Sequence, residues 1–399
     1  MKRLLLIFLL LASASFGQTT LFQIVESVPK ETTMEKSRLP RTQTVWLDMI
    51  KHSKNTLDIG MFYFANKKGE ALEPVMDAIK NAAARGVKVR ILVDSSFYSG
   101  SEKSVDELAG INNITIAKIS FKNSGGGVMH AKYIVADEKD VYSGSANADW
   151  RALDHIHELG VRVKNKKLGK CFETIFNYDW NNSDIGRNTI RQDISADDVI
   201  NSFNQLTIET KNYGKVTLFP CFSPIGKVPE IFSNEHDEML NIINNAKSSL
   251  HIQMYSYNTK DEFRDIDNAL RDAAARGVKI KIIFANWAIR KGATEVIQEL
   301  SKVKNIEVKF SAIPEHSSGF ISYARVEHCK YFIADNNISW ISSANWERGY
   351  FYGSRNTTIV IENKKVNAAL KNIFMFDWKS KYTEFVDANK TYESVKRSQ

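Results

Sequence analysis

Two stretches of this chain carry the same residues capable of chemistry: a histidine, a lysine two positions later, and an asparagine seventeen positions after the histidine. The first stretch reads VMHAKYIVADEKDVYSGSAN (128–147) and the second reads RVEHCKYFIADNNISWISSAN (325–345). In a β-strand, residues i and i+2 face the same way, so each histidine and lysine should project together. The shared residues are His130, Lys132 and Asn147 in the first stretch and His328, Lys330 and Asn345 in the second.

A site built from two imidazoles, two ammonium groups and two carboxamides matches a phosphodiester. Lysines and amide donors stabilise the charge that develops on phosphate oxygens during substitution. One imidazole can attack phosphorus, and the other can protonate the leaving oxygen and then activate water. The lysines supply the positive charge that a metal would otherwise bring, and the chain has no CxxC or HExxH spacing. We therefore expect neither a metal nor a cofactor.

The elements that position these residues are duplicated as well. The segment 51–64 resembles 244–257, and the segment 78–94 resembles 269–285. Each copy predicts a strand, a helix, a strand, a helix and a hairpin, which favours an α/β fold with mixed, mostly parallel sheets flanked by helices. We expect two such halves, at 22–185 and 216–385, joined by a linker at 186–215 and packed about a pseudo-two-fold axis. Each copy would then supply half of one site.

These motifs resemble those of the phospholipase D superfamily, which is marked by two HxKx4D motifs. The flanking segments at 144–161, 323–331 and 342–351 resemble the endolysosomal, spleen-exonuclease-type phospholipases D. The resemblance covers about residues 22–378. It implies a metal-independent phosphodiesterase with a phosphohistidine intermediate, and more narrowly a 5′-exonuclease acting on single-stranded DNA and RNA.

The resemblance also assigns roles to residues. The two histidines become nucleophile and general acid/base, while the two lysines and two asparagines bind phosphate. Ser145 and Ser343 take supporting polar positions among the substrate-binding residues. Asp137 and Asp335 match the motif aspartates of the catalytic set, and strand alternation places them off the substrate face.

The sequence predicts an asymmetry between the two histidines. Glu158 follows His130 by 28 residues, and Asn356 follows His328 by the same interval. An acidic residue near this position orients the histidine in the superfamily. We therefore expect Glu158 to polarise His130 and Asn356 to serve His328 and the substrate, which makes His130 the nucleophile.

Aromatic residues follow both motifs and have two readings. They either stack on the bases of a single-stranded nucleic acid or pack in the core and its rim. The residues concerned are Trp150, Trp287, Trp346, Tyr350 and Phe351.

The N-terminus has the form of a secretory signal. Lys2 and Arg3 precede the apolar run 4–11 and a small-residue segment, so we expect a signal peptide over 1–17 and a secreted or periplasmic protein. The three cysteines are too few for a disulfide framework. A net charge of +8 suits an anionic ligand without proving one.

Three functions remain open from the sequence. The leading hypothesis is a secreted nuclease on single-stranded nucleic acid. The alternatives are a phospholipase D or transphosphatidylase acting on phospholipids, and a catalytically inactive module that binds polyanions. No protein partner is evident, and the chain is expected to be a monomer with an internal pseudo-dimer, or a homodimer.

Overall fold

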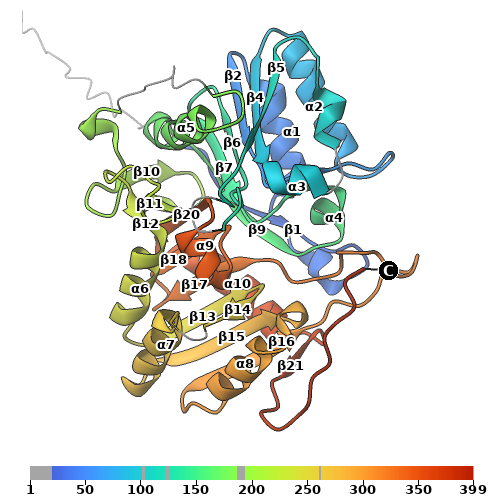
Figure 1. The fold of residues 1–399 in the computed structure, drawn as a ribbon. Coiled ribbons are helices and arrows are strands. Elements are labelled where there is room, and N and C mark those ends of the chain that lie inside the picture. The colour runs from blue at the N-terminus through green and yellow to red at the C-terminus, as the bar shows by residue number, and fades with distance from the viewer. Residues whose placement is uncertain (1–19, 101–103, 123–125, 187–193, 260–261, 399) are drawn as a thin grey trace, which may run out of the picture.

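A computed structural model describes residues 20–398, except for 101–103, 123–125, 187–193 and 260–261. The expected signal peptide lies outside the described residues. The first half forms the upper part of Figure 1 and the second half forms the lower part. Among the residues that are described, no helix is long and apolar enough to cross a membrane.

The first half is a seven-stranded sheet in the order β1-β9-β7-β6-β2-β4-β5. Helices α1 and α2 cover one face, and α5 covers the other (Figure 1). Its elements are β1 (Phe22–Ser27), α1 (Thr42–His52), β2 (Thr56–Gly60), β3 (Phe64–Ala65), α2 (Glu73–Ala84), β4 (Lys88–Asp94), α3 (Ser95–Gly100), β5 (Ile114–Ile119), β6 (Tyr133–Ala136), β7 (Asp140–Gly144), β8 (Ala148–Asp149), α4 (Trp150–Asp154), β9 (Glu158–Lys164) and α5 (Lys166–Asn181).

The second half repeats this plan in a larger sheet. Its main path runs β10-β11-β20-β18-β17-β13-β15-β16-β21. Its elements are β10 (Leu206–Thr210), β11 (Gly214–Ser223), β12 (Ser233–Asn234), α6 (Glu235–Asn245), β13 (Ser249–Met254), β14 (Tyr257–Asn258), α7 (Asp265–Ala275), β15 (Lys279–Ala285), α8 (Ala293–Ser301), β16 (Ile306–Ser311), β17 (Lys330–Ala334), β18 (Ile338–Ser342), β19 (Trp346–Glu347), α9 (Arg348–Tyr352), β20 (Asn356–Glu362), α10 (Lys364–Trp378) and β21 (Thr383–Phe385).

The α/β class and the repeat are confirmed, but the expected predominance of parallel pairs is wrong. In the first half, β2, β4 and β5 pair in parallel. The hairpin β6–β7 and the strands beyond it pair antiparallel, because the chain turns back there without a crossover helix. The second half has the same division around β13, β15 and β16. Part of the expected linker is also structured, since β10 pairs with β11 in the second sheet.

The local sequence explains the repeated βα units. Helix α2 has a proline in its first turn, where the missing N–H is not needed. Gly86 and Gly277 follow α2 and α7 with φ of 92° and 95°, a conformation that glycine adopts without strain. The strands that follow are almost entirely buried, as expected for strands covered on both faces.

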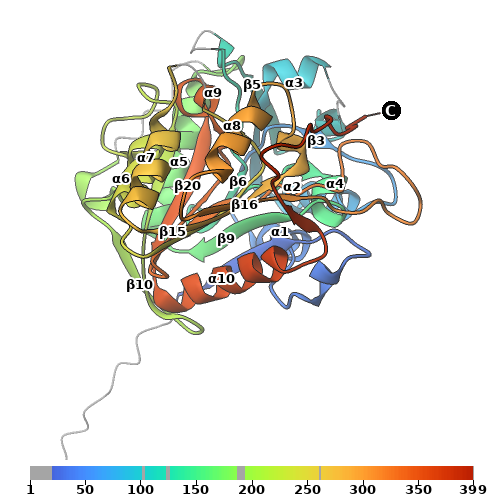
Figure 2. The ribbon, with the colours of Figure 1, turned by 90° about the horizontal axis from the view of Figure 1, so that it is seen from below.

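The two halves share one continuous apolar core. The rings of Phe172 on α5 and Phe222 on β11 lie 5.4 Å apart across the junction. At the same junction, Ser143 on β7 and Thr357 on β20 are joined by a hydrogen bond of 2.9 Å. In the view of Figure 2, α10 runs along the lower edge of the molecule. The halves are therefore fixed against each other, and a site between them can be rigid.

Candidate active site

Two short backbone bridges join the halves beside the histidines. In one bridge, Met129 pairs with Arg355, and His130 N–H donates to the Arg355 carbonyl at 2.9 Å. In the other, His157 pairs with Glu327, and His328 N–H donates to the His157 carbonyl at 2.9 Å. Each bridge therefore brings a histidine of one half next to the start of β9 or β20 of the other half.

These bridges exchange the expected partners of the histidines. His130 Nδ1 lies 2.9 Å from Asn356 Oδ1. His328 Nδ1 lies 2.8 and 2.9 Å from the two carboxylate oxygens of Glu158. The prediction that Glu158 orients His130 is therefore wrong. Both orienting residues act across the interface, which their spacing along the chain could not reveal.

The Asn356 amide has a defined orientation, because Nδ2 donates to the Tyr350 carbonyl at 2.8 Å and to Ser223 Oγ at 3.0 Å. Its Oδ1 must then accept from the His130 ring, which places a proton on Nδ1 and leaves Nε2 with a free lone pair. Asn356 therefore orients His130 and is not in a position to bind substrate, contrary to the expectation.

The two motif serines support the orienting residues. Ser145 Oγ donates to Glu158 Oε2 at 2.5 Å, and Ser343 Oγ donates to Asn356 Oδ1 at 3.1 Å. Both serines are completely buried. Their expected contact with substrate is therefore wrong, and they act by holding the residues that hold the histidines.

Both lysines are buried beneath the histidines. Lys330 Nζ donates to the His328 carbonyl at 2.6 Å, and Lys132 Nζ donates to the His130 carbonyl. Burial lowers the pKa of Lys330 to about 8. Burial, and then the nearby Lys330, lowers the pKa of Lys132 well below its ordinary value. An anionic phosphate would relieve both penalties, as expected of cations kept for that ligand.

The same environment keeps the histidines neutral before substrate binds. Burial and then the two lysines hold the pKa of His130 and of His328 well below 6.5. Burial also raises the pKa of Glu158 to about 8, against the opposing charge of Lys330. A neutral imidazole is the form that can attack phosphorus.

The histidines open into a pocket of about 720 Å³ that both halves line. Asn147 and Asn345 line it as predicted, together with His130 and His328. The pocket is also rich in aromatic rings. The lining residues are Phe62, Tyr63, Ala65, Phe97, Val128, His130, Asn147, Arg151, Ile156, Tyr255, Trp287, Tyr323, Val326, His328, Asn345 and Tyr350.

Two equivalent aromatic residues that the sequence analysis missed contact the histidines. The ring centroid of Phe62 lies 5.1 Å from that of His130, and the centroid of Tyr255 lies 4.7 Å from that of His328. Both residues follow the first strand of the repeat, in MFYF and MYSY. The signal was present, because aligned aromatics at a strand end of both halves indicate a shared edge of the site.

Of the five aromatic residues considered for base stacking, two line the pocket and three are buried outside it. Trp287 and Tyr350 line the pocket, as the stacking hypothesis requires. Trp346 does not, because it is completely buried against Tyr257, Phe332 and Trp340. The remaining two residues, Trp150 and Phe351, are also buried and outside the pocket lining.

The motif aspartates lie at the far ends of the hairpins from the catalytic residues. Asp137 accepts backbone N–H bonds from residues 54–56, at the start of β2. Asp335 accepts equivalent bonds from residues 247–249, at the start of β13. Their place in the catalytic set is therefore wrong, because they tie each hairpin turn to the adjacent strand.

Comparison with known proteins agrees with this duplicated architecture. A family model described as "Cardiolipin synthase, PLD-like domain" matches residues 46–180 and 239–378, one stretch in each half. Phospholipase D Y of Dictyostelium discoideum is 29% identical over 403 residues, covering 91% of each chain. The 5'-3' exonuclease PLD3 of Homo sapiens is 26% identical over 409 residues, covering 92% of this chain and 81% of that protein.

A solved structure shows the same fold. The phosphatidylserine synthase of Haemophilus influenzae Rd KW20 superposes with a TM-score of 0.61 at 12% identity. The superposition covers 86% of this chain and 85% of that one. The likeness therefore extends through both halves.

Proposed function

The chain belongs to the phospholipase D superfamily and is a phosphodiesterase of that superfamily, and from this premise we propose that it is a secreted 5′-exonuclease on single-stranded DNA or RNA. One observation carries the proposal. The two histidines, each hydrogen-bonded to a residue of the other half, line a pocket that also contains aromatic rings from both halves. The predicted signal segment supports the proposed location outside the cytoplasm.

The geometry supports a two-step reaction. His130 is neutral before substrate binds, and the bound phosphate anion favours uptake of a proton from solvent at its Nε2. In the first step, His328 Nε2 forms a bond to phosphorus, the bond from phosphorus to the leaving oxygen breaks, and protonated His130 gives that oxygen the proton from Nε2. In the second step, His130 takes a proton from water, the water oxygen bonds to phosphorus, and the phosphorus–nitrogen bond to His328 breaks. Lys132 and Lys330 stabilise the phosphate oxygens in both steps.

The exchanged partners reverse the assignment of the nucleophile. Phosphorylation of His328 at Nε2 leaves a positive ring, which favours the ionised form of the Glu158 carboxyl group against Nδ1 although burial raises the pKa of that group before substrate binds. Asn356 offers His130 only a neutral oxygen. His328 is also partly exposed in the pocket, whereas His130 is buried. The reasoning that favoured His130 therefore favours His328.

Aromatic groups on both sides of the reacting centre support a nucleic acid substrate. Phe62, Tyr63 and Phe97 lie in contact on the first-half side, with the rings of Tyr63 and Phe97 stacked 5.6 Å apart. Tyr255, Trp287 and Tyr323 form the second-half group. Base–aromatic stacking is worth about 1–3 kcal/mol per base and tolerates any sequence.

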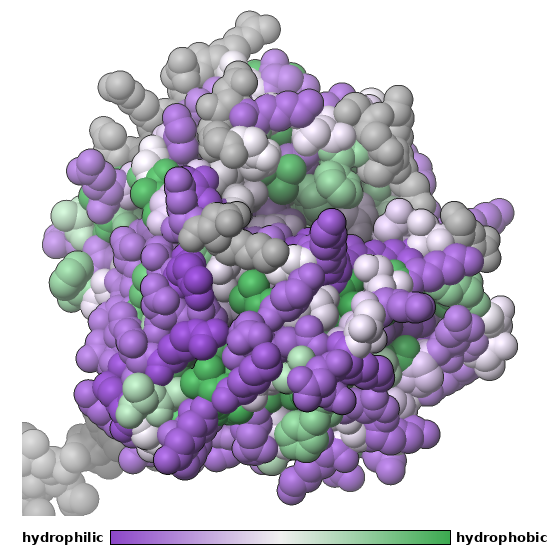
Figure 3. Space-filling model, turned by 60° about the horizontal axis from the view of Figure 1, so that its bottom comes forward, coloured by the Kyte–Doolittle hydropathy of each residue, from purple (hydrophilic) through white to green (hydrophobic). Residues whose placement is uncertain are grey.

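Phospholipid is the second candidate substrate. Phe97 and Tyr323 line the pocket and are 40% and 53% exposed, so they are placed to meet an acyl chain or a lipid surface. On the face seen in Figure 3, hydrophilic residues predominate and the apolar side chains lie in separate groups. A broad apolar rim would favour the lipid more strongly.

One assay separates these functions. Purified protein is incubated in EDTA with single-stranded oligonucleotides labelled at either end, with 5′-blocked copies, and in parallel with phosphatidylcholine vesicles. We expect stepwise digestion of the unblocked oligonucleotides from the 5′ end and none by H328A. Release of choline without oligonucleotide cleavage would establish the lipid alternative, and inertness toward both substrates would favour the binding module.

A further inference from the structure

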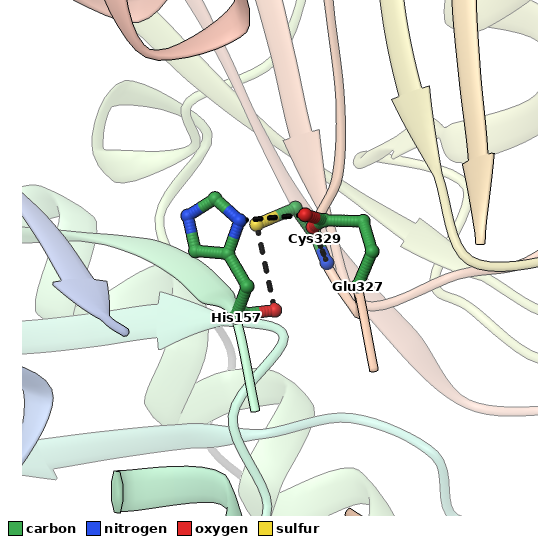
Figure 4. Close-up of side chains that lie close together, drawn as sticks. All are labelled: His157, Glu327 and Cys329. Carbon is green, nitrogen blue, oxygen red and sulfur yellow. Dashed lines mark hydrogen bonds and ion pairs between the residues drawn. The ribbon is translucent and has the colours of Figure 1, made fainter. Parts of the chain in front are cut away.

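A buried ion pair lies directly behind the half-site of His328. His157 precedes Glu158 and Glu327 precedes His328, and the two form one of the bridges between the halves. His157 Nδ1 lies 2.6 Å from Glu327 Oε2, and its Nε2 lies 3.0 Å from Glu26 Oε1. Figure 4 shows His157 and Glu327 facing each other beside Cys329. All three bonded side chains are buried.

Both ring nitrogens of His157 face carboxylate oxygens, which accept hydrogen bonds when ionised. The ring satisfies both only by donating from both nitrogens, which is the imidazolium form. The other titratable neighbours agree. Asp377 on α10 lies 3.6 Å from Nδ1, and Arg41 shares the carboxylate of Glu26.

The charges around the ring favour the same state. Burial opposes the positive charge, but Cys329, Glu327 and Asp377 raise the pKa of His157 well above 6.5. Burial raises the pKa of Asp377 to about 7, against the opposing effect of His157. Glu327 has its pKa lowered by His157 despite burial. The cluster therefore holds a cation between carboxylates.

The other bridge contains a corresponding pair. Arg355, which precedes Asn356, donates to both carboxylate oxygens of Asp179 at 2.7 and 2.8 Å. Both side chains are buried. Each bridge thus carries a buried cation one residue before the group that orients a histidine. Arginine keeps its charge at any working pH, whereas His157 has it only while protonated.

We propose that protonated His157 is a positioning residue for His328, which keeps the Glu158 carboxylate on His328 Nδ1 by clamping Glu327 and Glu26 across the interface. The inference rests on the proposed function of this site. The contacts leave no ring nitrogen free for a metal ion, although histidine, glutamate and cysteine side chains meet here.

The test compares H157Q with H155Q. His155 lies on the same segment and is also buried, but it packs against Trp150 and His316 and does not join the ion pair. With a nitrophenyl phosphodiester, we expect H157Q to lower kcat by about 10-fold with little change in KM, the low end for losing a residue that orients a catalytic ligand. The acidic limb of its kcat/KM profile should move, because the pKa of His328 depends on the hydrogen bond that its Nδ1 makes with Glu158. H155Q should change neither.

A double-mutant cycle that combines H157Q with E158Q shows whether His157 acts through Glu158. In an E158Q background, H157Q should cause no further loss of kcat. The proposal would be overturned if the losses of kcat in H157Q and E158Q were additive. It would also be overturned if H157Q folded and its kcat/KM profile kept the acidic limb of the wild type. E327Q provides a second variant that keeps the imidazole, and it should move the limb in the same direction as H157Q.

A spectroscopic arm does not depend on turnover. Nitrogen NMR of histidine-labelled protein at pH 8 should show one doubly protonated ring, and H157Q should lack that signal. A neutral His157 at that pH, or a stoichiometric metal ion that H157Q loses, would contradict the imidazolium. If the wild type cleaves no phosphodiester while this signal is present, the proposed function fails and the ion pair stands.

Discussion

The two half-sites have the same frame but different chemistry around the histidine. His130 lies against the neutral amide of Asn356, whereas His328 lies against the carboxylate of Glu158. Behind them, the bridge beside His130 is held by an arginine and the bridge beside His328 by a histidine. Duplication therefore supplied two equivalent positions, and divergence of the residues around them made the two imidazoles unequal. Unequal histidines suit a reaction that needs one nucleophile and one acid.

The largest loss of turnover should come from replacing the lysine that each half-site contains. Replacing Lys132 or Lys330 with methionine keeps the length of the side chain and removes its charge. We expect turnover to fall by at least ~100-fold in either variant, the scale for losing one transition-state donor. Steady-state rates on a nitrophenyl phosphodiester measure this, and a near-normal rate in either variant would exclude that lysine from the site.

The next prediction concerns the difference between the half-sites. E158Q gives His328 a neutral partner like that of His130, and we expect kcat to fall by roughly 10- to 100-fold because the positive charge on the phosphorylated ring loses its counter-charge. The matched variant is N356D, which gives His130 a carboxylate. Combining E158Q with N356D should partly restore turnover, with His130 as the nucleophile. Equal rates for wild type and E158Q would mean that the asymmetry has no role.

The pH dependence of kcat/KM should reveal the protonation state of Lys330. The ammonium of Lys330 is present below its pKa of about 8 and is lost as the pH rises through that value. We therefore expect kcat/KM to fall above pH 8, by about tenfold for each further unit. K330R keeps its charge, so its alkaline limb should lie at higher pH. An unchanged limb in K330R would assign the fall to another group.

The smallest effect on turnover should come from the motif aspartates, which are alike in the two halves. D137N and D335N each weaken a set of backbone hydrogen bonds far from the pocket. We expect a loss of stability of about 1–3 kcal/mol, with nearly unchanged kcat in the folded protein. Denaturant unfolding and turnover measured on the same samples check this. A large loss of kcat without a loss of stability would return these aspartates to the catalytic set.

Much of this comparison could be predicted from the sequence because it depends on local repetition. Spacing within each motif placed the histidines, lysines and asparagines, since strand alternation governs which side chains face together. The α/β halves followed from the repeated strand and helix patterns. Phe62 and Tyr255 were within reach of the same reasoning, because they occupy equivalent positions at a strand end in each half.

The rest depended on how the halves dock, which no local pattern encodes. Glu158 follows His130 in the chain but reaches His328, because the bridge at His157 and Glu327 sets the register between the halves. Trp346 follows a motif, but it belongs to β19, which pairs with β14, and its side chain is buried in the core. The share of parallel pairs was overestimated because the hairpin of each half and the strand beside it pair antiparallel.

The most direct test is to find which histidine carries the phosphoryl group. Wild type and H130A are reacted with a nitrophenyl phosphodiester, quenched without acid, digested and analysed by mass spectrometry of the peptides that contain each histidine. The nitrophenolate leaves with little acid assistance, so H130A should still form the adduct and accumulate it on His328, because His130 also activates water. H328A should form no adduct with any leaving group. A phosphoryl group on His130 in the wild type, with none on His328, would contradict the account and show that the carboxylate-held histidine is the acid.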